Sequence, residues 1–169
     1  MYLQCQNNTC EVSMRFSNIQ ILIIRLALAG LFLSLGIDKI HEGWLTNPEH
    51  LIASLNNFHQ RASGTHLYYL DTVAIPYADL WSKLIAIGET SLGVSLLLGL
   101  FARLSSLVGI FMVLNLHAAT GNLYSLNFFG SPWAALLIAS LLVTFLSRAG
   151  RWAGVDATLA KSKPGGKLW

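Results

Sequence analysis

Three ionisable side chains, Arg25, Glu89 and His117, interrupt long apolar stretches of this sequence. If these stretches cross a membrane, each charge at mid-depth costs about 2.5–3.5 kcal/mol on insertion scales, and such residues commonly mark ligand sites or proton pathways. A carboxylate and an imidazole can exchange protons, and a guanidinium can bind an anion or a carbonyl oxygen. We therefore take these three residues as the candidate catalytic residues.

Arg25 and Glu89 lie at similar depths when each is counted from the midpoint of its own apolar stretch at about 1.5 Å per residue. An unpaired charge at this depth is costly, so pairing inside the protein is the most favourable arrangement. We expect Glu89 to face Arg25, directly or through a polar ligand. A purely structural clamp between the two residues is the alternative interpretation.

One face of the first apolar stretch leads from the buried arginine toward the membrane surface. Its residues recur at the helical spacings of three and four: Arg25, Ala29, Phe32, Gly36 and Lys39. Asp38 lies at the outer end of this face, and His117 lies toward the same side of the third stretch. We therefore expect a quinone- or cofactor-sized cavity between the first three helices, open toward the outer leaflet. Its candidate cofactor-binding residues are Arg25, Asp38, Lys39, Glu89 and His117.

Helices that cross a membrane must hold these side chains in place. Hydrophobic residues make up 54% of the chain and charged residues only 11%, against about 25% charged residues in soluble domains. About 20 apolar residues are needed to cross a hydrocarbon core of ~30 Å. We expect four spans, at about 19–38, 80–101, 104–121 and 129–147. The predicted fold class is an all-α membrane protein, a four-helix transmembrane bundle that forms a single domain of residues 1–169.

Basic residues near the ends of the apolar stretches indicate the orientation in the membrane. Most fall on one side: Arg15, Arg103, Arg148, Arg151, Lys161, Lys163 and Lys167. Fewer fall on the other: Lys39, Arg61 and Lys83. Because positive residues favour the cytoplasmic side, both termini are predicted to be cytoplasmic. Residues 148–169 then form a cytoplasmic tail that contacts anionic lipid, and no binding of nucleic acid is expected.

The segment 41–79 is the expected outer cap of the bundle. Pro48 begins a pattern that predicts a short amphipathic helix, which extends to about Gln60 and lies along the membrane surface or over the bundle. The histidines of this segment have spacings that match no metal site, so no metal is expected. Cys5 and Cys10 are interpreted as reduced thiols.

Three segments resemble, in order and spacing, the signature segments of the DoxX family, which includes the DoxD subunit of thiosulfate:quinone oxidoreductase. They read "RLALAGLFLSLGIDKI", "IPYADLWSKLIAIGETSLGVSLLLGLFARLSSL" and "RAGRWAGVDATL". The resemblance implies a four-helix membrane bundle and, for some members, transfer of electrons from a small sulfur donor to quinone. The positions that carry it are Arg25, Glu89, Arg103, Gly150, Arg151, Trp152 and Asp156.

Motifs of common redox cofactors are absent from the sequence, which has no G-x-G-x-x-G turn, no C-x-x-C pair and no C-x-x-C-H haem attachment. We expect no covalently bound cofactor, and quinone is the candidate ligand. One interpretation is an integral membrane subunit associated with quinone-linked electron transfer, with a small sulfur compound as donor. The alternative is a non-catalytic accessory subunit of a larger respiratory or photosynthetic complex. In both cases the expected partners are the lipid bilayer and other membrane or redox subunits, in the inner (cytoplasmic) membrane of a bacterium or archaeon.

Overall fold

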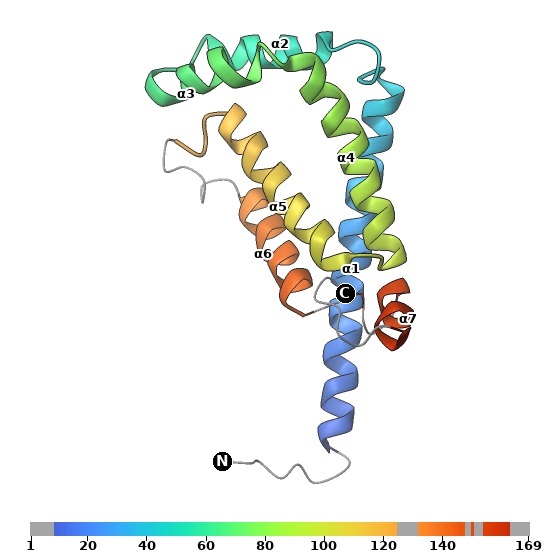
Figure 1. The fold of residues 1–169 in the computed structure, drawn as a ribbon. Coiled ribbons are helices and arrows are strands. Elements are labelled where there is room, and N and C mark those ends of the chain that lie inside the picture. Colours follow the sequence, from blue (N-terminus) through green and yellow to red (C-terminus); the bar gives the residue numbers. More distant parts are fainter. Residues whose placement is uncertain (1–8, 125–131, 148–149, 151–153, 163–169) are drawn as a thin grey trace.

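The computed structural model describes residues 9–124, 132–147, 150 and 154–162 (Figure 1). Within these ranges every regular element is a helix. In chain order they are α1 (Thr9–His41), α2 (Glu49–His59), α3 (Gly64–Tyr69), the π-helix η1 (Leu70–Ala74), α4 (Ala78–Leu98), α5 (Ala102–Ala119), α6 (Pro132–Leu146) and α7 (Val155–Ser162). The predicted all-α class is therefore confirmed.

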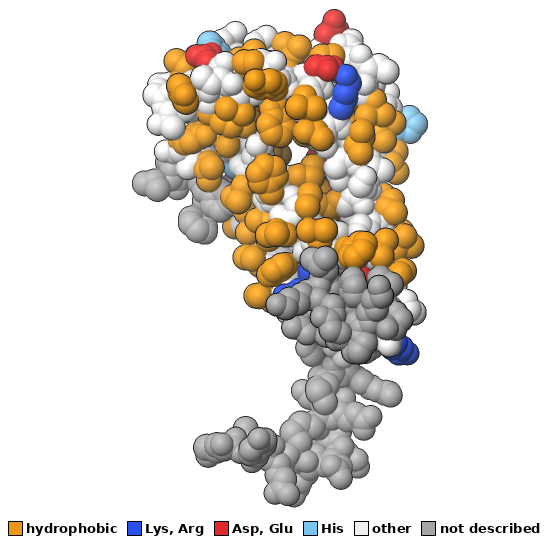
Figure 2. All heavy atoms as spheres, in the orientation of Figure 1, with side chains coloured by type: hydrophobic (Ala, Val, Ile, Leu, Met, Phe, Trp, Pro, Cys, Tyr) orange, Lys and Arg blue, Asp and Glu red, His pale blue; other side chains and the backbone are white. Residues whose placement is uncertain are grey.

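Three helices are long and apolar enough to cross a membrane: the part Asn18–His41 of α1, and the whole of α4 and α5. α6 is apolar but shorter, with 15 residues. Hydrophobic side chains cover much of the bundle surface (Figure 2), as contact with lipid tails requires. The expected membrane protein is thus confirmed, whereas residues 129–131 of the fourth predicted span lie outside the described residues.

The long helices form two pairs, α1 with α4 and α5 with α6 (Figure 1). At one end of the bundle, α2, α3 and η1 lie across the helices and form the cap (residues 42–77). At the other end, α7 lies beside the C-terminal end of α4. These two ends are called the cap end and the α7 end.

Two glycines bring α1 and α4 into close contact. A Cβ atom on Gly36 would lie 2.6 Å from the backbone nitrogen of Thr90, and one on Gly93 would lie 2.7 Å from the backbone nitrogen of Leu33. Small residues at such positions let helix backbones approach in a membrane, where no hydrophobic force drives them together. The two contacts also fix which residues of α1 face which residues of α4.

The buried face of α1 follows the predicted stripe. The stripe residues are all buried or half-buried, and Leu28 is buried beside them: Arg25, Ala29, Phe32, Gly36 and Lys39. Lys39 lies at the cap end of this face, and Arg25 lies almost four turns away toward the α7 end. The stripe is therefore confirmed as the face that α1 turns to its neighbours.

The apolar interior is divided into two clusters. The bundle cluster consists of Leu28, Ala29, Phe32, Leu92, Leu96, Val113 and Leu141. The cap cluster joins α2 and η1 to the start of α4 and consists of Leu55, Leu70, Ala74 and Ala78. Along α4, Glu89 comes between Ala78 of the cap cluster and Leu92 of the bundle cluster. It therefore lies at the boundary between two separately packed apolar regions.

Candidate functional site

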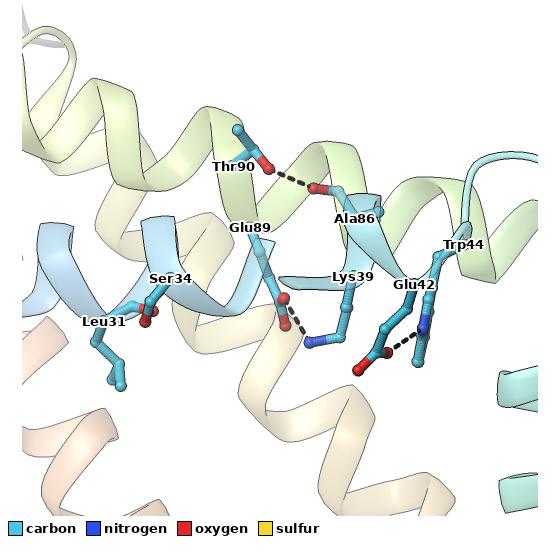
Figure 3. A network of polar contacts seen from close by, with 8 residues as sticks. All are labelled: Leu31, Ser34, Lys39, Glu42, Trp44, Ala86, Glu89 and Thr90. Carbon is cyan, nitrogen blue, oxygen red and sulfur yellow. Dashed lines mark hydrogen bonds and ion pairs between the residues drawn. The ribbon is translucent and has the colours of Figure 1, made fainter. Parts of the chain in front are cut away.

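An ion pair between Lys39 of α1 and Glu89 of α4 is the centre of the candidate site (Figure 3). The Lys39 Nζ atom lies 2.7 Å from the Glu89 Oε2 atom, and the two side chains are 18% and 12% exposed. Both residues belong to helices that are able to cross a membrane. Because little water surrounds the pair, its charges attract each other more strongly than those of a surface pair.

The close contact between α1 and α4 sets the position of this pair. Gly36 touches Thr90, the residue directly after Glu89. Lys39 follows Gly36 by three residues and therefore lies on the same face of α1, one turn nearer the cap. Its long, flexible stem can reach back along the helix to the carboxylate. The ion pair is thus a consequence of the way the two helices are aligned.

Two residues that follow α1 complete the surroundings of Lys39. The Nζ atom lies 5.4 Å from the centre of the Trp44 ring, within the range of a cation–π contact. The Trp44 Nε1 atom donates a hydrogen bond of 2.8 Å to the carboxylate of Glu42, which is exposed. Figure 3 shows the Lys39 ammonium group between the carboxylates of Glu89 and Glu42. The lysine therefore lies between a shielded carboxylate and one in contact with solvent.

This arrangement is suited to a ligand that carries oxygen atoms and exchanges protons. The ammonium group of Lys39 offers three N–H donors, while an ionised Glu89 carboxylate offers only acceptors. Together they can bind a carbonyl oxygen on one side and a hydroxyl group on the other. A carboxylate held away from water can also act as a general acid or base.

The expected pairing of Arg25 with Glu89 is wrong. Glu89 pairs with Lys39, and Arg25 lies about 20 Å from Lys39 along α1. The expectation assumed that the midpoints of the two apolar stretches lie at one level. In the structure α4 is displaced toward the cap, since Thr90 near its middle faces Gly36 near the end of α1. The alternative of a closed clamp between Arg25 and Glu89 is excluded by the same displacement.

Arg25 instead belongs to the α7 end of the molecule. It is buried, and the carboxylate of Asp156, also buried, is an electrostatic partner of its guanidinium group. Asp156 accepts hydrogen bonds from the backbone N–H groups of Phe101 and Ala102, at 2.7 and 3.0 Å. The two charges that were expected to form one site therefore lie in different parts of the bundle.

His117 also lies apart from the ion pair. Gly88 of α4 contacts the Met112 side chain of α5, which places His117 more than one turn nearer the cap than Glu89. The His117 side chain is buried in the last turn of α5. A single cavity lined by Arg25, Glu89 and His117 is therefore not what the structure shows, because these residues lie at three different levels.

Asp38, the last of the predicted ligand residues, is exposed on α1. It is adjacent to Lys39 in the chain, but neighbouring residues of a helix point about 100° apart. Of the five predicted cofactor-binding residues, Lys39 and Glu89 thus form one site. The other three lie elsewhere: Arg25, Asp38 and His117.

Sequence reasoning missed a group of polar and aromatic residues between α3 and α5. The His66 Nε2 atom lies 3.0 Å from the Ala119 carbonyl oxygen, and its ring is stacked on Tyr124 at 5.7 Å. The Tyr69 hydroxyl group lies 3.4 Å from the Asn115 Oδ1 atom. Burial and the neighbouring Tyr124 raise the pKa of Tyr69, and the hydrogen bond to Asn115 opposes this rise. These partners come from distant parts of the chain, and no local pattern links them.

Among the residues that the structure describes, no three His, Cys, Asp or Glu side chains lie close enough together to hold a metal ion. Several residues singled out in the sequence lie outside the described part of the chain: Cys5, Arg148, Arg151, Trp152, Lys163 and Lys167. Their expected roles in topology or as positions of the family pattern stay predictions.

The model of the DoxX family matches residues 20–121. The matched range includes Arg25, Lys39, Glu89 and His117, whereas Asp156 lies beyond it. No curated protein and no solved structure matches the chain.

Proposed function

Because the chain belongs to the DoxX family, we propose that it is an integral membrane subunit of quinone-linked electron transfer, and that a quinone head group meets the protein at Lys39 and Glu89. The observation that carries this proposal is the 2.7 Å ion pair, largely shielded from water, between two helices able to cross a membrane. Charges in such positions are costly and commonly serve ligand binding or proton transfer. We name Glu89 as the proton-exchanging group and Lys39 as the ligand-binding group.

The chemistry of the two side chains fits a quinone. Reduction of a quinone to a quinol adds two electrons to its conjugated ring system and one proton to each of its two oxygen atoms. Lys39 can donate a hydrogen bond to a carbonyl oxygen, and Glu89 can hold or accept a proton at a carboxylate oxygen. Glu42, which is exposed, lies near Lys39 in Figure 3 and is proposed as the place where protons enter.

In this proposal the electrons for quinone reduction come from a partner subunit. The sequence has no C-x-x-C pair and no haem attachment motif, so we propose that another membrane or redox subunit supplies them from a small sulfur compound. In this scheme the chain binds and orients the quinone and moves protons. Mild-detergent extraction of the protein from its native membrane would identify such a subunit directly.

A topology follows from the distribution of basic residues. We propose four spans with α6 as the last, the cap outside the cytoplasm with α2 lying along the membrane surface, and both termini in the cytoplasm of a bacterium or archaeon. Cysteine labelling at Ser63 in the cap and at Ser162 in α7 tests this directly. Labelling of the two positions from opposite sides of the membrane is expected. Labelling of both from the same side would contradict the topology.

The accessory role is the second candidate, and one observation favours it. The Glu89 carboxylate already has a close partner in Lys39, so the pair could serve only to align α1 with α4. An accessory subunit would then stabilise a larger complex without taking part in the reaction. In that case loss of the Glu89 charge would leave the turnover of the complex unaltered.

Quinone reduction by the complex recovered from native membranes separates the two roles. Glu89→Gln keeps the shape of the side chain but cannot exchange a proton, and turnover is expected to fall about a hundredfold, within the usual range for loss of a general acid or base. Asp79→Asn is the matched control because Asp79 is an exposed acid on the same helix. Normal turnover of a well-folded Glu89→Gln complex would reject the catalytic proposal and leave the accessory role.

A further inference from the structure

The first turn of α5 lacks a cap of its own. The position before the helix is held by Phe101, whose side chain cannot accept hydrogen bonds and whose backbone has a φ of 49°. This left-handed conformation is uncommon for a large residue. The first N–H groups of any helix need partners from outside the helix. The α4–α5 turn is therefore a strained connection that other parts of the chain must support.

Asp156 supplies the missing cap from a distant part of the chain. Its Oδ1 atom accepts a hydrogen bond of 2.7 Å from the Phe101 N–H group, and its Oδ2 atom accepts one of 3.0 Å from Ala102. Its own N–H group donates to the Gly99 carbonyl oxygen at 3.0 Å. The carboxylate thus lies at the positive end of the α5 dipole. The backbone hydrogen bond to Gly99 joins the same residue to the C-terminal end of α4.

The same carboxylate also compensates a charge on α1. Arg25 is 3% exposed and Asp156 is 1% exposed, and their charges attract each other. A buried arginine without a counter-charge would destabilise the bundle strongly. Asp156 therefore acts on α1, α4 and α5 at once, although it lies in none of them.

Two glycines allow the C-terminal segment to come this close. A Cβ atom on Gly150 would overlap the Asp156 carboxylate, and one on Gly154 would lie 2.8 Å from the Gly99 Cα atom. Neither space admits a larger side chain. The backbone of the segment is therefore fitted to the α4–α5 turn, as expected for a specific contact and not for a loosely attached tail.

A second charged side chain, that of Arg103, binds the C-terminal end of α6 in this part of the bundle. The Arg103 Nε atom donates a hydrogen bond of 3.2 Å to the Phe145 carbonyl oxygen, near the C-terminal end of α6. Its guanidinium carbon also lies 5.0 Å from the centre of the Phe145 ring. A cation at a helix C-terminus and a carboxylate at a helix N-terminus both match the helix dipole. At the α7 end, charged side chains that bind helix ends therefore connect α7 with α5 and α5 with α6.

We propose that Gly154 and α7 form a latch, in which the Asp156 carboxylate locks the α4–α5 turn and Arg25 into a single arrangement. The latch is a part of the membrane bundle and adds a role beyond that of a cytoplasmic tail that contacts lipid. The α4–α5 turn and the neighbouring part of α1 reach their final arrangement only when α7 has docked. Release of the latch frees the turn, while the contacts between Gly36 and Thr90 nearer the cap stay in place.

Hydrogen exchange at the α4–α5 turn of the full-length protein tests the latch. In Asp156→Asn the side chain keeps only one acceptor oxygen and carries no charge, so exchange of the Phe101 and Ala102 amide protons is expected to be about tenfold faster, the order expected for loss of one hydrogen bond to a charged group. Asp79→Asn, which changes an exposed aspartate at the start of α4, should leave both rates unchanged.

A second variant acts on the latch without changing its carboxylate. Gly154→Ala places a methyl group against Gly99 and should displace the segment, so exchange at Phe101 should again accelerate. Gly30→Ala is its control, because nothing lies within 4 Å of a Cβ atom there. If folded Asp156→Asn or folded Gly154→Ala kept the slow exchange of the parent protein, the latch would be rejected.

Discussion

Glu89 and Asp156 are both carboxylates removed from solvent, yet their surroundings differ in kind. Asp156 is 1% exposed, accepts two backbone hydrogen bonds and attracts the buried Arg25 electrostatically. Glu89 is 12% exposed and pairs with the flexible side chain of a lysine. A carboxylate held by fixed backbone donors has little freedom to exchange a proton or to bind a ligand. One held by a mobile ammonium group keeps that freedom.

The cations at the two ends repeat this difference. Arg25 is deeply buried among the helices of the α7 end, whereas Lys39 lies near the end of α1, beside the Trp44 ring and within reach of solvent. Arginine presents a rigid fork of donors, while lysine carries its charge on a flexible stem. Under the proposed function, this comparison favours Glu89 over Asp156 as the proton-exchanging group.

The largest expected effect concerns Asp156. Asp156→Leu leaves the N–H groups of Phe101 and Ala102 without their acceptor and Arg25 without its counter-charge. The free energy of unfolding in detergent should fall by about 3 kcal/mol or more. Thermal unfolding measures it, with Asp79→Leu expected within about 0.5 kcal/mol of the parent protein. If Asp156→Leu lost no more stability than Asp79→Leu, the interpretation of Asp156 as the firmly held carboxylate of the pair would be rejected.

The alignment of α1 with α4 gives the next largest effect. Gly36→Ala forces a methyl group against the backbone of Thr90, and such overpacking typically costs about 1–3 kcal/mol. Gly30→Ala on the same helix meets no neighbour and should be neutral or stabilising by up to about 1 kcal/mol. Equal stability of the two variants would contradict the tight packing of Gly36 against Thr90.

The ion pair itself should contribute less. Lys39→Met leaves Glu89 shielded without a partner, and a loss of about 1–2 kcal/mol is expected, between the values for exposed and for fully buried pairs. The double variant Lys39→Met/Glu89→Leu should recover most of this loss. Lys83 and Asp79 provide the matched control, since their atoms are also 2.7 Å apart but the side chains are 43% and 62% exposed. Their double-mutant coupling should stay below about 0.5 kcal/mol.

The smallest effect is expected at the cap end, away from both carboxylates. Tyr69→Phe removes a hydroxyl group whose hydrogen bond to Asn115 is long, at 3.4 Å, and should cost less than about 1 kcal/mol. Because the pKa of Tyr69 is raised, its phenol stays neutral at pH 7 and this cost should not change between pH 6 and pH 8. Exposed Tyr68→Phe is the control. A marked pH dependence in this range would contradict the assignment.

The sequence predicts well what depends on local spacing. The buried face of α1 from Arg25 to Lys39 follows from residues that recur every three or four positions, and the long apolar helices can be recognised from their own composition, whereas α3, η1 and α7 were not predicted. The relative height of two helices does not follow in this way. It depends on the fit of Gly36 against Thr90 and of Gly93 against Leu33. Because of this fit, Glu89 pairs with Lys39 and not with the expected Arg25.

Contacts between distant residues explain the rest of what was missed. Asp156 caps a helix that begins 54 positions earlier in the chain, so no motif near Ala102 announces the cap. The resemblance to a family singled out Asp156 and Gly150 as pattern positions, and the structure gives them a physical reason: the carboxylate caps α5, and the glycine makes room for it.

The length of α1 has a mechanical consequence. The helix begins at Thr9, and its membrane-crossing part begins only at Asn18. The intervening residues extend it by about 13 Å, and Figure 1 shows this part projecting beyond α7. A continuous helix bends and twists little over this length, so this part of α1 keeps the direction that the packing of Gly36 and Gly93 between α1 and α4 sets.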